Sequence, residues 1–139
     1  MVNQFFIYFD DGMPRGTAQQ KGERVIMKNG RPVILHYKKD KVESARNQFI
    51  LKLREHKPKE PAQGPIKLTV MFYFDVKEKR LWGKPKPTKP DNSNFIKEFE
   101  DAMTAVGFWK DDAQVWDLHI MKFYAGKASI FVRWEEATQ

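Results

Sequence analysis

The sequence predicts an α+β fold with a single mixed β-sheet and two main helices, in the order β-ββ-α-β-α-ββ. Two observations lead to this prediction. Short runs rich in β-branched and aromatic residues recur along the chain, as strands require. Two longer stretches, residues 41–56 and 93–106, instead repeat their apolar residues at helical spacing. No internal repeat or linker divides the chain, so residues 1–139 are expected to form one domain.

The first half of the chain is predicted to hold a strand, a hairpin and a helix. Residues 4–9, QFFIYF, have the composition of a strand. In residues 24–37 two apolar runs flank Asn29-Gly30, a pair that accepts the positive φ of a tight hairpin turn. A helix is predicted from Lys41 to about His56, where apolar residues recur at Val42, Ala45, Phe49, Ile50 and Leu53.

The second half is predicted to hold a strand, a helix and two further strands. Residues 66–74, IKLTVMFYF, alternate in polarity like a half-buried strand. In residues 93–106 the apolar side chains fall within roughly a 120° arc of a helix, and Gly107 supplies its C-terminal stop. Residues 113–124 and 128–134 are predicted strands joined at 125–127.

Charge and composition exclude several classes of protein. The formal net charge of +7 favours a polyanionic partner. The chain has no cysteine, which excludes disulfides, zinc-thiolate sites and cysteine nucleophiles. The first apolar run soon reaches Asp10 and Asp11, which is unlike a signal peptide, and no run approaches the length of a membrane span. A soluble, cytoplasmic protein without a membrane partner is therefore expected.

Two aspartates, Asp91 and Asp112, flank the second predicted helix. If the turn after this helix doubles back, Asp112 approaches the helix flank. Carboxylates brought together in this way need a neutralising partner. Mg²⁺ is typically held by one or two carboxylates with water and phosphate, and it can polarise a phosphodiester and generate a hydroxide nucleophile. Lys97, on the outer face of the helix, would stabilise charge developing on the phosphate.

A basic loop precedes this helix. Residues 75–90 are rich in proline and glycine and carry six cations, which favours contact with a phosphate backbone. An earlier loop adds two more. The predicted DNA-binding residues are Arg15, Lys21, Lys77, Lys79, Arg80, Lys84, Lys86 and Lys89.

Each of these patterns has a simpler explanation. Asp91 or Asn92 could cap the helix, and Asp112 could be a turn acid. Lys97 could form a solvated ion pair with Glu100 or Asp101. The basic loop could be a solvated linker. Trp82 and Trp109 could stack on bases or pack in the core. An RNA-binding domain is disfavoured because the chain lacks RRM and KH signatures.

The segment KPDNSN-FIK-x₃-DAM-x₃-GFWKDDAQV-x-D, residues 89–117, resembles the signature of the RusA family of Holliday-junction resolvases. The basic N-terminal stretch and the final hairpin resemble that family more loosely. The resemblance implies a RusA-like fold and a homodimeric, Mg²⁺-dependent endonuclease, with Mn²⁺ as a substitute metal. Such enzymes cut four-way or other branched DNA by paired nicks and are often of phage origin, which implies the cytoplasm of a bacterial host.

The resemblance also implies roles for individual residues. Asp91 and Asp112 match acids of the motif and are expected to ligate the metal, and Lys97 matches its catalytic lysine. Ser93 departs from the pattern because it replaces a second aspartate, so we expect it to reach the metal only through water.

Asp101, Asp111 and Asn94 are candidate accessory residues. The missing carboxylate leaves an alternative open. The chain could be a branched-DNA-binding protein with weak or no nuclease activity.

Overall fold

The computed structural model describes residues 2–14, 21–38 and 40–137, with the backbone alone at 21–26, 33–38 and 40–44. The predicted α+β class and element order are confirmed. No helix within these ranges is long and apolar enough to cross a membrane. The elements are β1 (Val2–Tyr8), β2 (Lys21–Lys28), β3 (Arg31–Lys38), α1 (Asp40–Leu53), β4 (Ile66–Asp75), α2 (Asn92–Val106), β5 (Val115–Ala125) and β6 (Ser129–Glu136), with short 3₁₀ turns η1 (Arg54–His56), η2 (Lys79–Leu81) and η3 (Asp112–Gln114).

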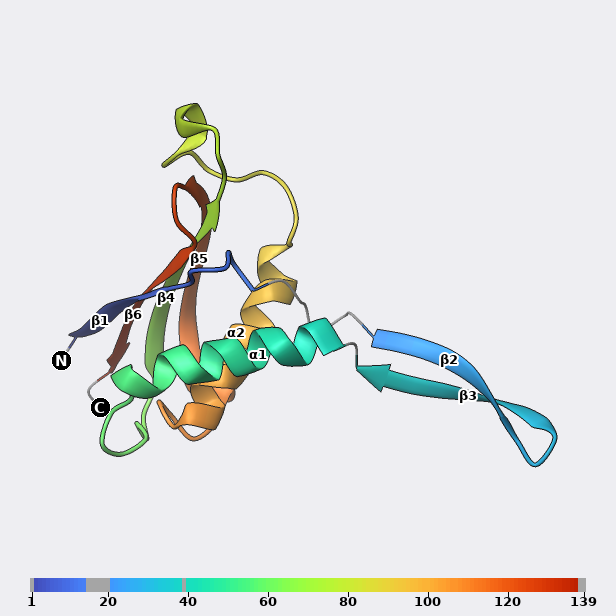
Figure 1. Cartoon of the computed structure of the whole chain (residues 1–139). Coiled ribbons are helices and arrows are strands. Elements are labelled where there is room, and N and C mark those ends of the chain that lie inside the picture. The colour runs from blue at the N-terminus through green and yellow to red at the C-terminus, as the bar shows by residue number, and fades with distance from the viewer. Residues whose placement is uncertain (1, 15–20, 39, 138–139) are drawn as a thin grey trace.

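Four strands form the mixed sheet, in the order β1-β6-β4-β5. Strands β4 and β5 are parallel, and the other pairs are antiparallel. The hairpin β2–β3 does not join this sheet but forms a two-stranded sheet of its own, which projects from the body (Figure 1). The predicted turn is present, with positive φ at Asn29 and Gly30. This local turn pairs the two strands with each other, so they need no neighbour in the main sheet.

Both main helices cover one face of the sheet (Figure 1). The alternating residues of β4 that face the helices are buried, as the sequence pattern predicted. Phe49 of α1 packs edge-to-face on Phe95 and Phe99 of α2, with ring centroids 5.9 and 5.2 Å apart. Trp109 is also buried, and its indole Nε1 donates to Thr104 Oγ1. Trp109 therefore belongs to the core and is not a base-stacking residue.

The opposite face of the sheet carries an aromatic patch that no described element covers. Phe6 and Tyr8 are 44% and 49% exposed there, although each is large and apolar. Cross-strand registers bring further members alongside them. We call this surface the open sheet face, and its apolar members are Phe6, Tyr8, Met71, Tyr73, Met121, Phe123 and Phe131.

Candidate active site at the outer face of α2

The start of α2 leaves polar atoms that the helix does not use. Asp91 occupies the N-cap position, and its backbone carbonyl accepts a hydrogen bond from Phe95 N at 2.9 Å, but its exposed side chain makes no capping hydrogen bond. The Oδ1 atom of Asn92 is buried and has no hydrogen-bond partner among the described residues. Ser93 and Lys97 are both exposed one turn apart. Helix capping therefore does not account for the Asp91 carboxylate.

A lysine from the sheet fixes the segment that leads into α2. Lys122 Nζ, on β5, donates hydrogen bonds to the backbone carbonyls of Thr88 at 2.6 Å and Pro90 at 2.8 Å. These bonds position the chain immediately before Asp91 and place a positive charge beside it. The sequence analysis missed Lys122 because a single lysine in a strand looks like ordinary alternation.

The basic loop is anchored along the free edge of β5. Tyr124 N donates to Lys84 O at 3.0 Å, and the backbone N–H groups of Gly83 and Lys86 donate to carbonyls of Tyr124 and Lys122. These are strand-like bonds, so the loop is not a solvated linker. Of the loop cations expected to bind DNA, Lys86 is half-buried. The others are exposed: Lys77, Lys79, Arg80, Lys84 and Lys89.

Trp82 holds this loop against the β5–β6 turn. Its indole Nε1 donates to Val76 O at 2.9 Å. A Cβ atom on Gly126 would lie only 2.9–3.1 Å from the Trp82 ring, so only glycine allows this approach. Trp82 is 43% exposed, and its packing on the turn accounts for one face of the ring.

The turn after α2 carries Asp112 and is held rigidly. Asp111 Oδ1 accepts a hydrogen bond from Ala113 N at 2.9 Å, and Gln114 Oε1 accepts from Asp111 N to complete a capping box. Gln114 Nε2 in turn donates to the carbonyls of Ala62 and Gly64. The side chain of Asp111 therefore serves the turn, which leaves Asp112 as the acid presented to α2.

The turn η3, which begins at Asp112, packs against α2, the arrangement that the sequence left open. Partial desolvation, the neighbouring Asp111 and the negative charge of Asp101 together raise the pKa of Asp112 above its usual range. Asp101 belongs to α2, so this electrostatic effect acts across the contact between the turn and the helix.

Glu100 is the most strongly perturbed acid of this surface. Its burial raises its pKa from 4.5 to about 7, with smaller contributions from the charges of Asp112 and Asp101. The negative charge of Asp112 opposes ionisation of Glu100. The charges of Asp101, Glu100 and Asp112 therefore repel at the outer face of α2, although the three side chains are not arranged to hold a metal between them.

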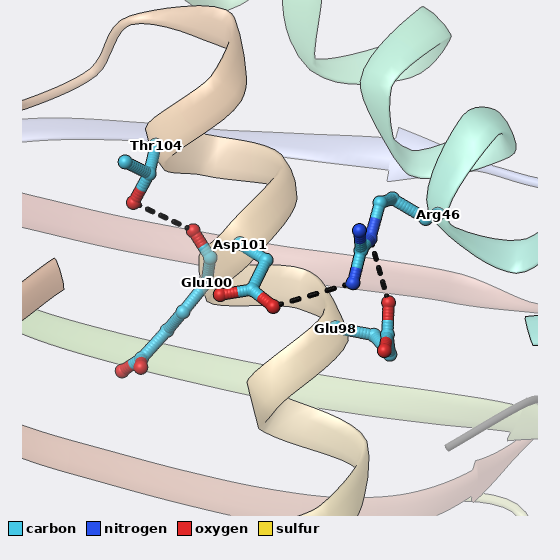
Figure 2. Close-up of polar contacts among 5 residues, drawn as sticks. All are labelled: Arg46, Glu98, Glu100, Asp101 and Thr104. Carbon is cyan, nitrogen blue, oxygen red and sulfur yellow. Dashed lines mark hydrogen bonds and ion pairs between the residues drawn. The ribbon is translucent and has the colours of Figure 1, made fainter. Parts of the chain in front are cut away.

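A buried ion pair lies on the other side of α2 (Figure 2). Arg46 of α1 donates from Nε to Glu98 Oε2 at 2.8 Å, and its Nη2 lies 3.4 Å from Asp101 Oδ2. Glu98 is fully buried, whereas Asp101 is half-exposed. The sequence analysis missed both partners of the buried pair, because its apolar pattern for α2 did not include Glu98 and gave no hint of the Arg46 partner. Within the described residues no ion pair joins Lys97 to Glu100 or Asp101.

Comparison with known proteins places the chain in a family. A family model described as Endodeoxyribonuclease RusA matches residues 11–135. The chain belongs to the RusA family. It is 34% identical over 109 residues to the "Crossover junction endodeoxyribonuclease rusA" of Lactococcus phage r1t, covering 76% of each chain. It is also 33% identical over 95 residues to an uncharacterised protein, YqaN, of Bacillus subtilis, covering 60% of this chain and 66% of the relative.

The RusA signature residues are only partly brought together. No described interaction joins Asp91 to Asp112. Glu100 lies beside Asp112. The rise of α2 from Asp91 to Glu100, at 1.5 Å per residue, is about 13 Å, so Asp91 lies at the other end of this surface. Across residues 2–14, 21–38 and 40–137, no group of three or more His, Cys, Asp or Glu side chains is arranged to hold a metal. Ser93 offers an exposed hydroxyl where the sequence resemblance leads us to expect an acid. Of the remaining predicted cations, Arg15 and the side chain of Lys21 lie outside what the structure describes.

The raised pKa of Glu100 predicts a stability difference that depends on pH. The folded protein binds this proton more tightly than the unfolded chain, so the free energy of unfolding falls as pH rises from 4.5 towards 7. A Glu100→Gln variant lacks this loss. It should match the wild type at pH 4 and exceed it in stability at pH 8. Urea unfolding at both pH values in EDTA measures the difference, and an equal difference at the two would contradict the assignment.

Proposed function

We propose that this protein is a structure-specific endodeoxyribonuclease that resolves four-way DNA junctions by Mg²⁺-dependent phosphodiester hydrolysis with paired nicks, within a single domain spanning residues 1–139. The carrying observation is that two acids with raised pKa values, Asp112 and Glu100, lie at the outer face of α2, the helix into which the anchored basic loop leads, in a chain of the RusA family. Acids that repel one another on a helix, together with cations on the loop that leads into that helix, suit a site where a metal and a DNA phosphate bind together.

The oxygen donors at the two ends of α2 are of the chemical type that Mg²⁺ prefers, although no described interaction joins Asp91 to Asp112. Asp91 and Asp112 would hold it, with Ser93 acting through water and the buried Asn92 Oδ1 or Asn94 as further donors. Two carboxylates are enough for a Mg²⁺ site that substrate phosphate completes. When bound, the metal supplies Lewis-acid polarisation of the phosphate and a hydroxide nucleophile at neutral pH.

The chain's own cations would orient the substrate. Lys97, exposed on the same face as Ser93, is positioned to stabilise charge on the phosphate oxygens. The anchored loop would grip the DNA backbone through its exposed lysines, whatever the base sequence. Because backbone hydrogen bonds hold this loop to β5, it loses little conformational freedom when DNA binds.

The test is nicking of an end-labelled four-way junction, with a linear duplex of the same sequence as control, in Mg²⁺, Mn²⁺ and EDTA. We expect symmetrical cuts in the junction alone, and only when a metal is present. Cuts in EDTA would contradict the metal proposal, and equal cutting of the duplex would contradict specificity for junctions.

We also propose that the protein acts as a homodimer, joined through the open sheet face. A two-fold axis would bring two equivalent sites to two like strands of a junction. Charged residues of both signs border the aromatic patch: Lys67, Asp117, Arg133 and Glu135. A second copy related by a two-fold axis can therefore place opposite charges together. Phe6→Asp should give a monomer in sedimentation, whereas the exposed Leu51→Asp on α1 should not. The reverse result would move the interface to the helices.

One observation favours a second candidate, a junction-binding protein that cuts poorly. Ser93 leaves the site one carboxylate short of the family motif, and no three-acid cluster forms among the described residues. On this alternative, Ser93→Asp should raise the cleavage rate about tenfold or more, because ligand charge governs affinity for hard cations. Cleavage measured across a Mg²⁺ titration separates tighter metal binding from faster chemistry. An unchanged rate would show that the serine is already accommodated.

A further inference from the structure

The β2–β3 hairpin projects from the body without a described partner (Figure 1). Its strands pair along their whole length, from Lys21 opposite Lys38 to Lys28 opposite Arg31. Within the described ranges, the hairpin makes no extended contact with another helix or strand. A lone two-stranded hairpin is at best marginally stable in water, so this arrangement suggests a binding partner.

Charge on the hairpin is concentrated and unfavourably paired. Residues 21–38 hold five Lys or Arg and one Glu, so this segment supplies +4 of the chain's +7. At the tip the register sets like charges opposite each other, Lys28 with Arg31. Like charges directly opposite on paired strands are destabilising, and a polyanion would relieve this repulsion.

The backbone register runs through the centre of the hairpin to an exposed tip. The register places Val25 opposite Ile34 and Ile26 opposite Val33. At the tip, Lys28 and Arg31 are exposed on either side of the turn, and Met27 is 68% exposed. The tip therefore presents two cations and one apolar side chain to solvent.

We infer that the hairpin is a DNA-gripping arm, which reaches along a duplex arm of the junction and contacts its phosphates through Lys28 and Arg31. This inference rests on the proposed function and assigns it a second contact surface, separate from the basic loop beside α2. The dimensions fit. A two-stranded ribbon enters the major groove of B-DNA. Eight residues of strand extend about 26 Å, most of one helical turn of duplex.

A second copy of the chain is the other occupant to consider. Every copy carries the same excess of positive charge, so an arm with +4 would meet electrostatic repulsion on its partner. DNA offers the opposite charge at high density. The observations therefore favour DNA, and an oligomeric state that depends on the tip would overturn this choice.

The first experiment compares two double variants with the same charge change. Lys28→Gln/Arg31→Gln removes the tip cations, and Lys57→Gln/Lys59→Gln removes two exposed lysines from the loop after η1. Binding to a four-way junction is measured in EDTA at several salt concentrations. Loss of two phosphate contacts should make the negative slope of log K against log salt shallower by about 1.8. This corresponds to roughly 60-fold weaker binding at 0.1 M salt. The control should match the wild type.

The outcomes separate this inference from the proposed function. If the wild type binds junctions and the tip variant binds with the same affinity and slope, the arm is wrong but the function stands. If the wild type itself does not bind DNA, the proposed function fails. If the tip variant changes the sedimentation of the free protein, the arm belongs to an interface between copies.

The second experiment locates the tip on the DNA directly. The chain has no cysteine, so Met27→Cys creates a unique thiol for an iron-EDTA cleavage reagent. The labelled variant also carries Asp112→Asn, so that it binds the junction without cutting it itself. In this complex the reagent should cut the duplex arms several base pairs from the branch point. The same reagent at Lys59→Cys is the control. Equal, unlocalised cutting from both positions would overturn the inference.

Discussion

Replacing Asp112 by Asn should lower the rate of junction cleavage by on the order of a thousandfold, with little change in folding or in DNA binding. Asp112 is the turn acid that lies beside α2, and it is the metal ligand we propose there. Removing its charge deprives a hard cation of a ligand, and loss of such electrostatic stabilisation typically costs this much rate. Single-turnover cleavage at saturating protein measures the chemical step separately from binding.

The folded state should tolerate this change because the carboxylate is crowded. Asp101 and Asp111 both oppose its ionisation, so an amide removes repulsion. Asp111→Asn is the matched control: asparagine caps a turn as well as aspartate, so this variant should keep most of the activity. Full metal-dependent cleavage by Asp112→Asn would remove this residue from the site.

Replacing Arg46 by Met should destabilise the protein by about 3 kcal/mol. Arg46 forms the ion pair with Glu98 Oε2 at 2.8 Å, and Glu98 is fully buried between α1 and α2. Breaking a buried pair from one side leaves a carboxylate in low dielectric without its cation, which typically costs 3–5 kcal/mol. We take the lower end because the Arg46 side chain is one-third exposed. Urea unfolding at pH 7 gives the value.

A double variant identifies the cause. Arg46→Met/Glu98→Leu removes both charges and keeps the volume, so it should recover most of the lost stability. The second contact of Arg46, with the half-exposed Asp101, should contribute less than 1 kcal/mol, as Arg46→Met in an Asp101→Asn background would show. A cost below 1 kcal/mol for Arg46→Met alone would mean that the pair does not hold the helices together.

The sequence by itself determined the local features of this protein. Polarity repeats predicted both main helices and strand β4, because burial of one face imposes such a repeat on each segment alone, and β-favouring composition predicted β1. Asn29-Gly30 predicted the hairpin turn, and Gly107, with its φ of 104°, the end of α2. The spacing of Asp91, Lys97 and Asp112 carried the family resemblance that the comparisons confirm.

Only the tertiary structure decided what these segments contact. It separated the hairpin from the main sheet, brought Asp112 to Glu100 and Asp101, and placed Lys122 under the carbonyls that precede Asp91. It also paired the buried Glu98 with Arg46. These partners lie far apart along the chain, Arg46 and Glu98 by 52 residues, and local periodicity carries no information about such distances. Charge and burial at this site are properties of the packed helices and sheet, which no single segment encodes.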